Sequence, residues 1–222
     1  MRINIAIDGP SAAGKSTIAK KCAKLLGYSH LDTGAMYRCV AYKAKKEGID
    51  WNDEEKLAEM IKNMKIDFNK DGKVYLDHED VSQKIRTNDI SMGASSVSRH
   101  LKVRECLVEL QQQIAKNKGY ILDGRDIGTV VLKDAELKIY LVASASARAE
   151  RRIKEYIEKG IDFDRDEIIK DIERRDYQDT HREHSPLKKA EDAIEIDSSD
   201  LTIDEVVSKI KNELDRLGVV YD

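Results

Sequence analysis

An apolar run near the N-terminus leads directly into an octapeptide bounded by glycines. Residues 3–7 read INIAI, which is typical of a short buried strand, and residues 9–16 read GPSAAGKS, which fits the pattern G-x-x-x-x-G-K-[ST] in full. Apolar residues then recur at helical spacing, at Ile18, Cys22, Leu25 and Leu26. Glycines let the backbone wrap so that several N–H groups point at one phosphate, and a helix start adds partial positive charge. The sequence therefore predicts a phosphate-binding P-loop between a strand and a helix.

Two side chains of this loop carry chemistry. We expect Lys15 to reach the outer phosphates of a nucleotide and Ser16 to ligate Mg²⁺. The predicted ATP-binding residues are Gly9, Pro10, Ser11, Ala12, Ala13, Gly14, Lys15, Ser16 and Thr17. An ordinary glycine turn before a helix is the alternative. GTPases add an Asn-Lys-x-Asp motif that reads guanine, and neither residues 69–72 nor residues 117–120 fit it.

Strand-like and helix-like segments alternate along the chain. Short apolar strands end near residue 31 and follow at residues 120–122, 139–142 and 193–196, with periodic helices between them. Thr202 and Glu205 form a capping-box pair that opens the last helix. This alternation predicts an α/β fold with a parallel sheet covered by helices on both faces.

One region breaks the alternation. Residues 50–98 are charged and less periodic, and two strand-like segments at 65–68 and 73–76 flank Asp71-Gly72, a hairpin signal. We therefore expect a core of residues 1–49 and 99–222 with an inserted subdomain at 50–98. A second charged region, from Arg148 to about Lys189, is expected to be largely helical.

Composition excludes several classes of function. The 222 residues carry a formal net charge of -3 and only 5% aromatic residues, so neither a basic stripe nor a stacking platform for nucleic acid is present. The three cysteines are too widely spaced for a disulfide framework or a zinc site. Apolar stretches fall well short of the roughly 20 residues that a membrane span requires. We expect a cytoplasmic monomer that binds neither membrane nor nucleic acid.

Two charged clusters follow predicted strands. Residues 123–129 read DGRDIGT, and ligands of open parallel sheets bind beyond the carboxyl ends of strands. Asp123 is placed to hold Mg²⁺ through its waters, although a salt-bridged surface loop is the alternative. Residues 31–38 join a strand to a helix start, where a phosphate could rest on N–H groups with Arg38 one turn in. The alternative there is a plain helix cap made by Asp32 or Thr33.

Arginines dominate the second charged region. Arg148, Arg151 and Arg152 share one helical face, and Arg175, Asp179 and Arg182 share another if their helix continues to a stop near Pro186. Arginines of this kind can neutralise the charge that spreads over a phosphoryl group in transfer. A solvated ladder of salt bridges is the alternative. His181 and His184 are poor candidates for a metal site, because the surrounding arginines would repel a cation.

Four motifs together resemble the bacterial cytidylate kinase family over nearly the whole chain. They are residues 5–17, 31–38, 123–131 and 175–187. The resemblance implies a P-loop nucleoside monophosphate kinase fold, with residues 50–98 as a monophosphate-binding subdomain and a helical lid at about 148–165. It implies transfer of phosphate from ATP, with Mg²⁺, to CMP and dCMP, forming CDP and dCDP in pyrimidine metabolism.

The resemblance also implies roles for single residues. Thr33, Tyr37 and Arg38 match the stretch around the acceptor's phosphate and ribose, and Arg125 matches a phosphate contact. Ser95, Arg104 and Asp126 match residues that read cytosine, while Arg175, Asp179 and Arg182 match residues that meet the acceptor and the transferred phosphate. The expected catalytic residues are Lys15, Arg148, Arg152 and Arg182. The base assignment is chemically consistent, because a carboxylate accepts from the exocyclic amino group of cytosine and would face a carbonyl in uracil.

Two other functions stay open at this point. The chain could be a kinase for another small acceptor, such as UMP or shikimate. It could also be a P-loop regulatory module that binds ATP and hydrolyses it slowly. Residues 123–129 argue against the module, because a switch needs no pocket that reads an acceptor.

Overall fold

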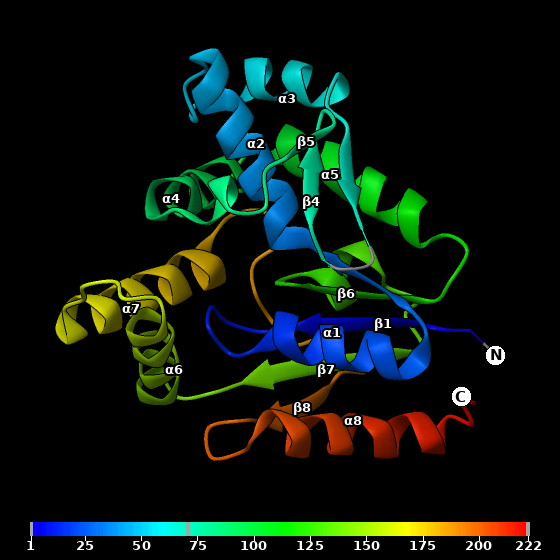
Figure 1. Ribbon diagram of the computed structural model, residues 1–222. Helices are drawn as coiled ribbons and strands as arrows, with labels where there is room; N and C mark the ends of the chain where they lie inside the picture. The colour runs from blue at the N-terminus through cyan, green and yellow to red at the C-terminus, as the bar shows by residue number, and fades with distance from the viewer. Residues whose placement is uncertain (1, 70–71, 221–222) are drawn as a thin grey trace. The chain divides into compact units, whose positions relative to one another are not determined.

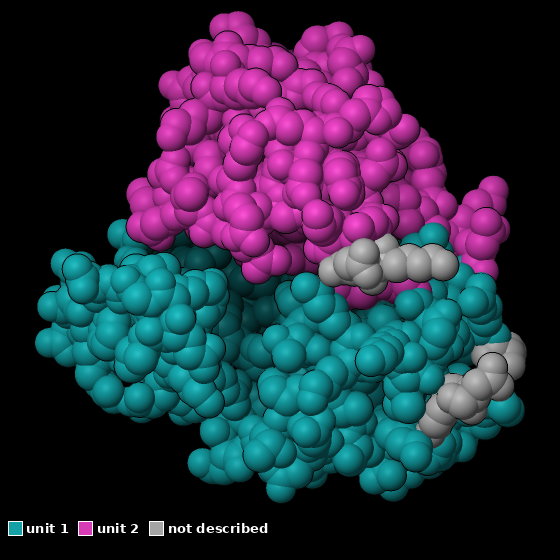
Figure 2. Space-filling model, in the orientation of Figure 1, with its two compact units in different colours: residues 1–28, 118–222 teal, residues 29–117 magenta. Residues whose placement is uncertain are grey.

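The computed structural model describes residues 2–69 and 72–220, which form two compact units (Figures 1 and 2). Unit 1 comprises residues 1–28 and 118–222, and unit 2 comprises residues 29–117. The predicted insertion at 50–98 lies within unit 2, and its separate role in monophosphate binding stays a prediction. Asp71 of the predicted hairpin signal lies outside the described residues.

Parallel strands form the centre of unit 1. They are β1 (Asn4–Asp8), β6 (Tyr120–Gly124), β7 (Leu137–Val142) and β8 (Ile194–Asp197), in the order β6-β1-β7-β8. All three pairings are parallel. Every residue of β1 is buried, as expected for a strand covered on both faces. The register pairs Ile7 with Asp123 and Asp8 with Gly124, so the charged ends of β1 and β6 lie side by side.

Helices α1 (Lys15–Leu26) and α8 (Ile203–Arg216) pack on this sheet through one apolar core (Figure 1). The core joins Ile18 and Cys22 of α1, Val206 and Ile210 of α8, and the isoleucines of β1. The predicted capping box of α8 is confirmed, with Glu205 N donating to Thr202 Oγ1. The α/β fold with parallel strands flanked by helices is therefore the predicted one.

A helical pair follows β7. Helices α6 (Ala145–Glu158) and α7 (Arg165–His181) pack on each other through a small apolar cluster of Ala149, Ile153, Ile168 and Ile172. The condition under which Arg175, Asp179 and Arg182 would share a helical face is not met, because α7 ends at His181. Arg182 has extended backbone angles, φ -64° and ψ 144°, and terminates the helix. A π-helix, η2 (Ile127–Val131), follows β6 and was not predicted.

Unit 2 contains more regular structure than the sequence pattern indicated. Its elements are β2 (Ser29–Asp32), α2 (Thr33–Glu47), α3 (Glu54–Lys62), β3 (Ile66–Phe68), β4 (Val74–Leu76), β5 (Glu79–Asp80), the 3₁₀ helix η1 (Lys84–Arg86), α4 (Asn88–Val97) and α5 (Leu101–Ala115). The predicted pairing of the two hairpin segments is confirmed, since β3 and β4 are antiparallel. Short helices α3 and α4 were missed. Across the described residues, no helix is both long and apolar enough to cross a membrane.

Candidate active site

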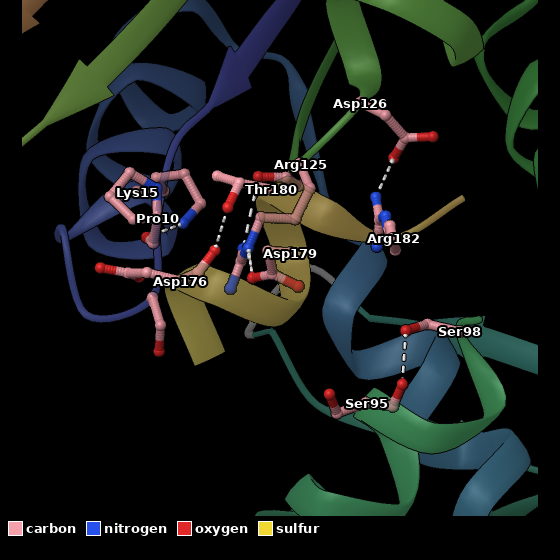
Figure 3. Close-up of polar contacts among 12 residues, drawn as sticks. Pro10, Lys15, Ser95, Ser98, Arg125, Asp126, Asp176, Asp179, Thr180 and Arg182 are labelled. Atoms are coloured by element: carbon pink, nitrogen blue, oxygen red, sulfur yellow. Dashed lines mark hydrogen bonds and ion pairs between the residues drawn. The ribbon is translucent and has the colours of Figure 1, made fainter. Parts of the chain in front are cut away.

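The P-loop connects β1 to α1 as predicted. Positive φ angles occur at Gly9 (152°), Ala12 (59°) and Gly14 (92°). Residues in this region turn successive N–H groups toward one side of the chain, which forms a concavity suited to an anion. Lys15 begins α1, and its Nζ atom donates to the carbonyl of Pro10 at 2.6 Å. The loop therefore has a backbone shape that suits the predicted cradle, and Lys15 lies against it (Figure 3).

The Lys15 ammonium lies in a costly environment. Its side chain is buried, and burial lowers its pKa to about 7, with the nearby Arg125 guanidinium acting in the same direction. Asp123, Asp179 and Asp8 act against this shift without reversing it. The carboxylates around Lys15 do not fully offset the cost of burying its charge, and the negative charge of a bound polyphosphate would offset it.

The two predicted Mg²⁺ ligands lie together. Ser16 Oγ donates to Asp123 Oδ2 at 2.7 Å, and Asp123 is buried at the end of β6. The strand register explains the contact, because Asp123 is paired with Ile7, just before the P-loop. A hydroxyl and a carboxylate are hard oxygen donors, so this pair fits the preference of Mg²⁺.

An ion pair next to the loop joins Arg125 to Asp179. Arg125 Nε donates to Asp179 Oδ2 at 2.6 Å (Figure 3). Burial opposes ionisation of Asp179, yet Arg125, Arg182 and Arg175 together hold its pKa below the usual value. The predicted grouping of Arg175, Asp179 and Arg182 is thus present in unit 1, although α7 ends before Arg182.

Arg182 also approaches a carboxylate. Its Nη2 atom lies 3.8 Å from Asp126 Oδ1, and both side chains are almost fully buried, at 6% and 7% exposure. Arg182 Nε donates to the carbonyl of Ser185 at 2.7 Å. The extended backbone at Arg182 directs this side chain toward Asp126 (Figure 3).

The arginines of α6 differ from the expectation of a bare basic face. Arg148 is buried and bonds both oxygens of Asp176, and Arg151 donates to Ala13 O and Ser198 Oγ, each at 3.2 Å. Both side chains therefore have partners of their own in unit 1, and each ties α6 to another segment of that unit. Arg152 lies partly buried, and among the described residues no hydrogen bond or ion pair holds it. The catalytic roles of Arg148 and Arg152, and a lid at 148–165, stay predictions.

In unit 2 the predicted residues form two groups. Asp32 caps α2 by accepting from Ala35 N at 2.9 Å, so the cap considered as an alternative is real. Thr33 is buried beside it, and Arg38 follows one turn later. A phosphate here would depend on Arg38 more than on the N–H group of Ala35.

The second group of unit 2 surrounds Arg104. This buried guanidinium lies over the ring of Tyr37, 5.4 Å from its centroid, and Nη1 donates to Ser98 O at 3.1 Å. Ser98 Oγ in turn donates to Ser95 O at 2.9 Å (Figure 3). Tyr37, Ser95 and Arg104 are therefore linked within unit 2, and the base-reading role expected of Ser95 and Arg104 stays a prediction.

Sequence reasoning missed two carboxylates that organise unit 1. Asp8 is buried and accepts from two backbone N–H groups of η2, and Asp176 holds Arg148. Asp8 closes an apolar strand, where a charged residue is unusual. That signal could have found it. Asp176 lies in a helix rich in charges, and nothing in the pattern separates it from its neighbours.

A parallel sheet, a P-loop with a buried lysine and a set of arginines around Asp179 define the class of P-loop phosphotransferases. The sequence model of the cytidylate kinase family matches residues 5–216. The cytidylate kinase of Bacillus subtilis is 49% identical over 218 residues, covering 97% of this chain and 97% of that one. The cytidylate kinase of Lactobacillus johnsonii is 53% identical over 211 residues, covering 94% of this chain and 92% of that one.

A gluconokinase from Sinorhizobium meliloti superposes on the structure with a TM-score of 0.51 at 14% identity, covering 97% of this chain and 93% of that one. At that identity the likeness concerns the fold alone. The family match and the two relatives decide the rest: the chain belongs to the cytidylate kinase family, and it is an enzyme of the nucleoside monophosphate kinase class.

Proposed function

We propose that this enzyme transfers the terminal phosphoryl group of ATP to CMP and dCMP, forming CDP or dCDP and ADP. The observation that carries the proposal is the cluster of charged residues at the end of β6 and directly after it. Asp123, Arg125 and Asp126 stand within four positions of one another, beside the P-loop. A module that only binds ATP has no need of this cluster.

The P-loop would bind the phosphates of ATP. Its N–H groups and the N-terminus of α1 face the anion, and Lys15 follows the charge that develops as the phosphoryl group leaves. Ser16 and Asp123 are the residues that would hold Mg²⁺, which would supply positive charge to neutralise the phosphates when bound. Neutralisation of the outer phosphates makes attack by an acceptor oxygen easier.

The arginines around Asp179 would stabilise the transferred group. Arg125 is oriented by its hydrogen bond to Asp179. Arg175 and Arg182 lie close enough to the same carboxylate to lower its pKa. Phosphoryl transfer leaves charge on three equatorial oxygens, and fixed guanidinium donors match that distribution. Arg148 and Arg152 are proposed as further donors from α6, with Arg148 leaving Asp176 to do so.

The base would be read by Asp126 with Arg104 and Ser95. The carboxylate accepts from the amino group of cytosine, and arginine donates to the O2 and N3 acceptors. Thr33, Tyr37 and Arg38 are proposed to bind the phosphate and ribose of the acceptor. The expectation of a cytoplasmic monomer stays a prediction.

The proposal can be tested by following ADP release with ATP, Mg²⁺ and a panel of acceptors. CMP and dCMP should be used efficiently, and UMP, AMP, GMP and shikimate poorly. Comparable turnover of UMP would contradict the base assignment. Slow ATP hydrolysis that no acceptor accelerates would instead favour the regulatory module.

A further inference from the structure

Asp8 closes β1 one residue before the P-loop, and its carboxylate bonds to the segment that follows β6. The residue is 5% exposed. Its Oδ1 atom accepts from Ile127 N at 2.8 Å, and its Oδ2 atom accepts from Gly128 N at 2.7 Å. Both oxygens are therefore committed to a segment about 120 residues further along the chain.

Those two N–H groups open the π-helix η2. The first N–H groups of any helix lack intrahelical partners, and the residue that precedes the helix usually caps them with its own side chain. Here that residue is Asp126, a type well suited to capping, yet its side chain makes no cap bond. Asp8 supplies the cap from another strand.

The Asp126 carboxylate points toward Arg182 and not toward the N–H groups at the start of η2. Asp126 Oδ1 lies 3.8 Å from Arg182 Nη2 (Figure 3). The Asp126 carbonyl accepts from Val130 N at 2.9 Å and from Val131 N at 3.2 Å. The backbone of Asp126 is thus fixed by η2, and its side chain points toward the arginine group. A self-capping Asp126 would place its carboxylate over Ile127 and Gly128 instead.

We propose that Asp8 is a positioning residue which caps η2 in place of Asp126 and so holds the Asp126 carboxylate ready for the acceptor's base. This inference rests on the proposed function and deepens it. It also links the ATP cradle to the base reader, because Asp8 is bonded to Gly9 of the P-loop and accepts two hydrogen bonds from the residues that follow Asp126.

Two further observations agree with a role beyond stability. A buried carboxylate is costly to ionise, and burial raises the pKa of Asp8 to about 6 despite the two N–H donors. Gly128 also leaves little room beside the cap. A Cβ atom at Gly128 would lie 3.4 Å from Asp8 Oδ2 and 3.1 Å from Lys138 Cδ.

The test is a double-mutant cycle with Asp8→Asn and Asp126→Ala. Asparagine keeps one acceptor oxygen and turns an NH₂ group toward the other N–H donor, so the cap fails on one side. We expect Asp8→Asn to raise KM for CMP about tenfold, the effect of one charge-assisted hydrogen bond, and to change KM for ATP less than about twofold. In the Asp126→Ala background, Asp8→Asn should add less than about twofold.

A purely structural cap predicts a different pattern. The effects of the two substitutions on KM for CMP would then multiply, or KM for both substrates would rise together, and either result would overturn the inference. Asn4→Ala is the matched control, because Asn4 is buried at the other end of β1 and accepts from Tyr120 N at 3.2 Å. It should lower stability without separating the two KM values.

Two outcomes need a second measurement. If Asp8→Asn does not fold, Gly128→Ala disturbs the same cap from its other end and should raise KM for CMP selectively; equal KM values for the parent and Gly128→Ala would overturn the inference. If the parent enzyme turns CMP over normally and the effects of Asp8→Asn and Asp126→Ala on KM for CMP multiply, only the role of Asp8 is overturned. Failure of the parent to use CMP would overturn the proposed function and this inference together.

Discussion

Arg148 and Asp176 face each other across α6 and α7 with two parallel hydrogen bonds, Nη1 to Oδ1 at 2.9 Å and Nη2 to Oδ2 at 2.6 Å. The same guanidinium donates to Ala143 O at 2.9 Å and to Ser11 O at 3.2 Å. One arginine therefore ties the helical pair to a carbonyl of the P-loop. The arginine side chain is 6% exposed and the aspartate 27%, so solvent screens this pair little.

We expect Asp176→Ala to lower the free energy of unfolding by roughly 2–3 kcal/mol, because it leaves a buried guanidinium without its carboxylate. Glu150→Ala is the control, since Glu150 pairs with Arg165 across the same two helices but both side chains are more than half exposed. That substitution should cost less than about 1 kcal/mol. Urea unfolding of both variants measures the difference, and similar losses would show that the Arg148 pair contributes no more than a surface contact.

Gly9 has a positive φ of 152°, and a Cβ atom there would lie 2.0 Å from the carbonyl oxygen of Leu141. The contact is with the backbone of β7, which cannot move aside without breaking the sheet. Gly9→Ala should therefore destabilise unit 1 by several kcal/mol, about the upper range of single substitutions, and reduce ATP binding. Gly27→Ala is the comparison, because Gly27 has φ 62° but open space around it, and it should cost only about 1 kcal/mol. Thermal unfolding distinguishes the two, and equal shifts would contradict the steric argument.

The sequence was most informative where several local rules agreed over a short stretch. Residues 3–7 and the P-loop pattern predicted β1, the loop and α1, because burial, glycine geometry and helix periodicity agree over a short stretch. The Thr202–Glu205 capping box was predictable for the same reason. These features depend on neighbours within four residues, which a sequence displays directly.

Long-range pairings were not predictable. The spacing from Arg175 and Asp179 would have put Arg182 on the same helical face, but the helix ends at His181 and an extended backbone brings Arg182 to Asp126. Arg148 and Arg151 form a basic stripe in sequence, yet Asp176 and backbone carbonyls pair with them in the fold. The cap that Asp8 provides for η2 joins segments separated by strands and helices, and no periodic pattern carries that information.

Asp126 makes a prediction about specificity. Asp126→Asn presents an amide in which an NH₂ donor can face the carbonyl of uracil, while the charge that favours the cytosine amino group is lost. We expect kcat/KM for CMP relative to UMP to fall by about tenfold or more, the value of one charge-assisted hydrogen bond. Asp204→Asn serves as control, since Asp204 pairs with Lys21 at the surface, where both side chains are exposed. An unchanged CMP preference in Asp126→Asn would remove Asp126 from base recognition.

The pKa of Lys15 predicts a proton uptake on nucleotide binding. In the ligand-free protein, burial and the nearby Arg125 lower this pKa to about 7. At pH 8 much of Lys15 is then neutral. Polyphosphate stabilises the ammonium, so ATP binding at pH 8 should be accompanied by uptake of up to about one proton. Calorimetric titrations in two buffers of different ionisation enthalpy measure that number. Lys15→Met should abolish the uptake and lower kcat/KM about 100-fold or more.

The same pKa fixes the sign of a stability effect. Folding lowers the pKa of Lys15 from 10.5 to about 7, so between these pH values the folded chain binds fewer protons than the unfolded chain. The charged lysine therefore destabilises the folded state most below about pH 7, and this destabilisation diminishes as the pH rises. In the absence of nucleotide, Lys15→Met should therefore raise the free energy of unfolding at pH 7, by an amount on the order of a few kcal/mol, and raise it less at pH 9. Unfolding of parent and variant at both pH values decides the matter. A less stable variant, or a gain in the free energy of unfolding that grows with pH, would contradict this. Either result would show that Lys15 is already protonated in the loop without ATP and that ATP binding takes up no proton there.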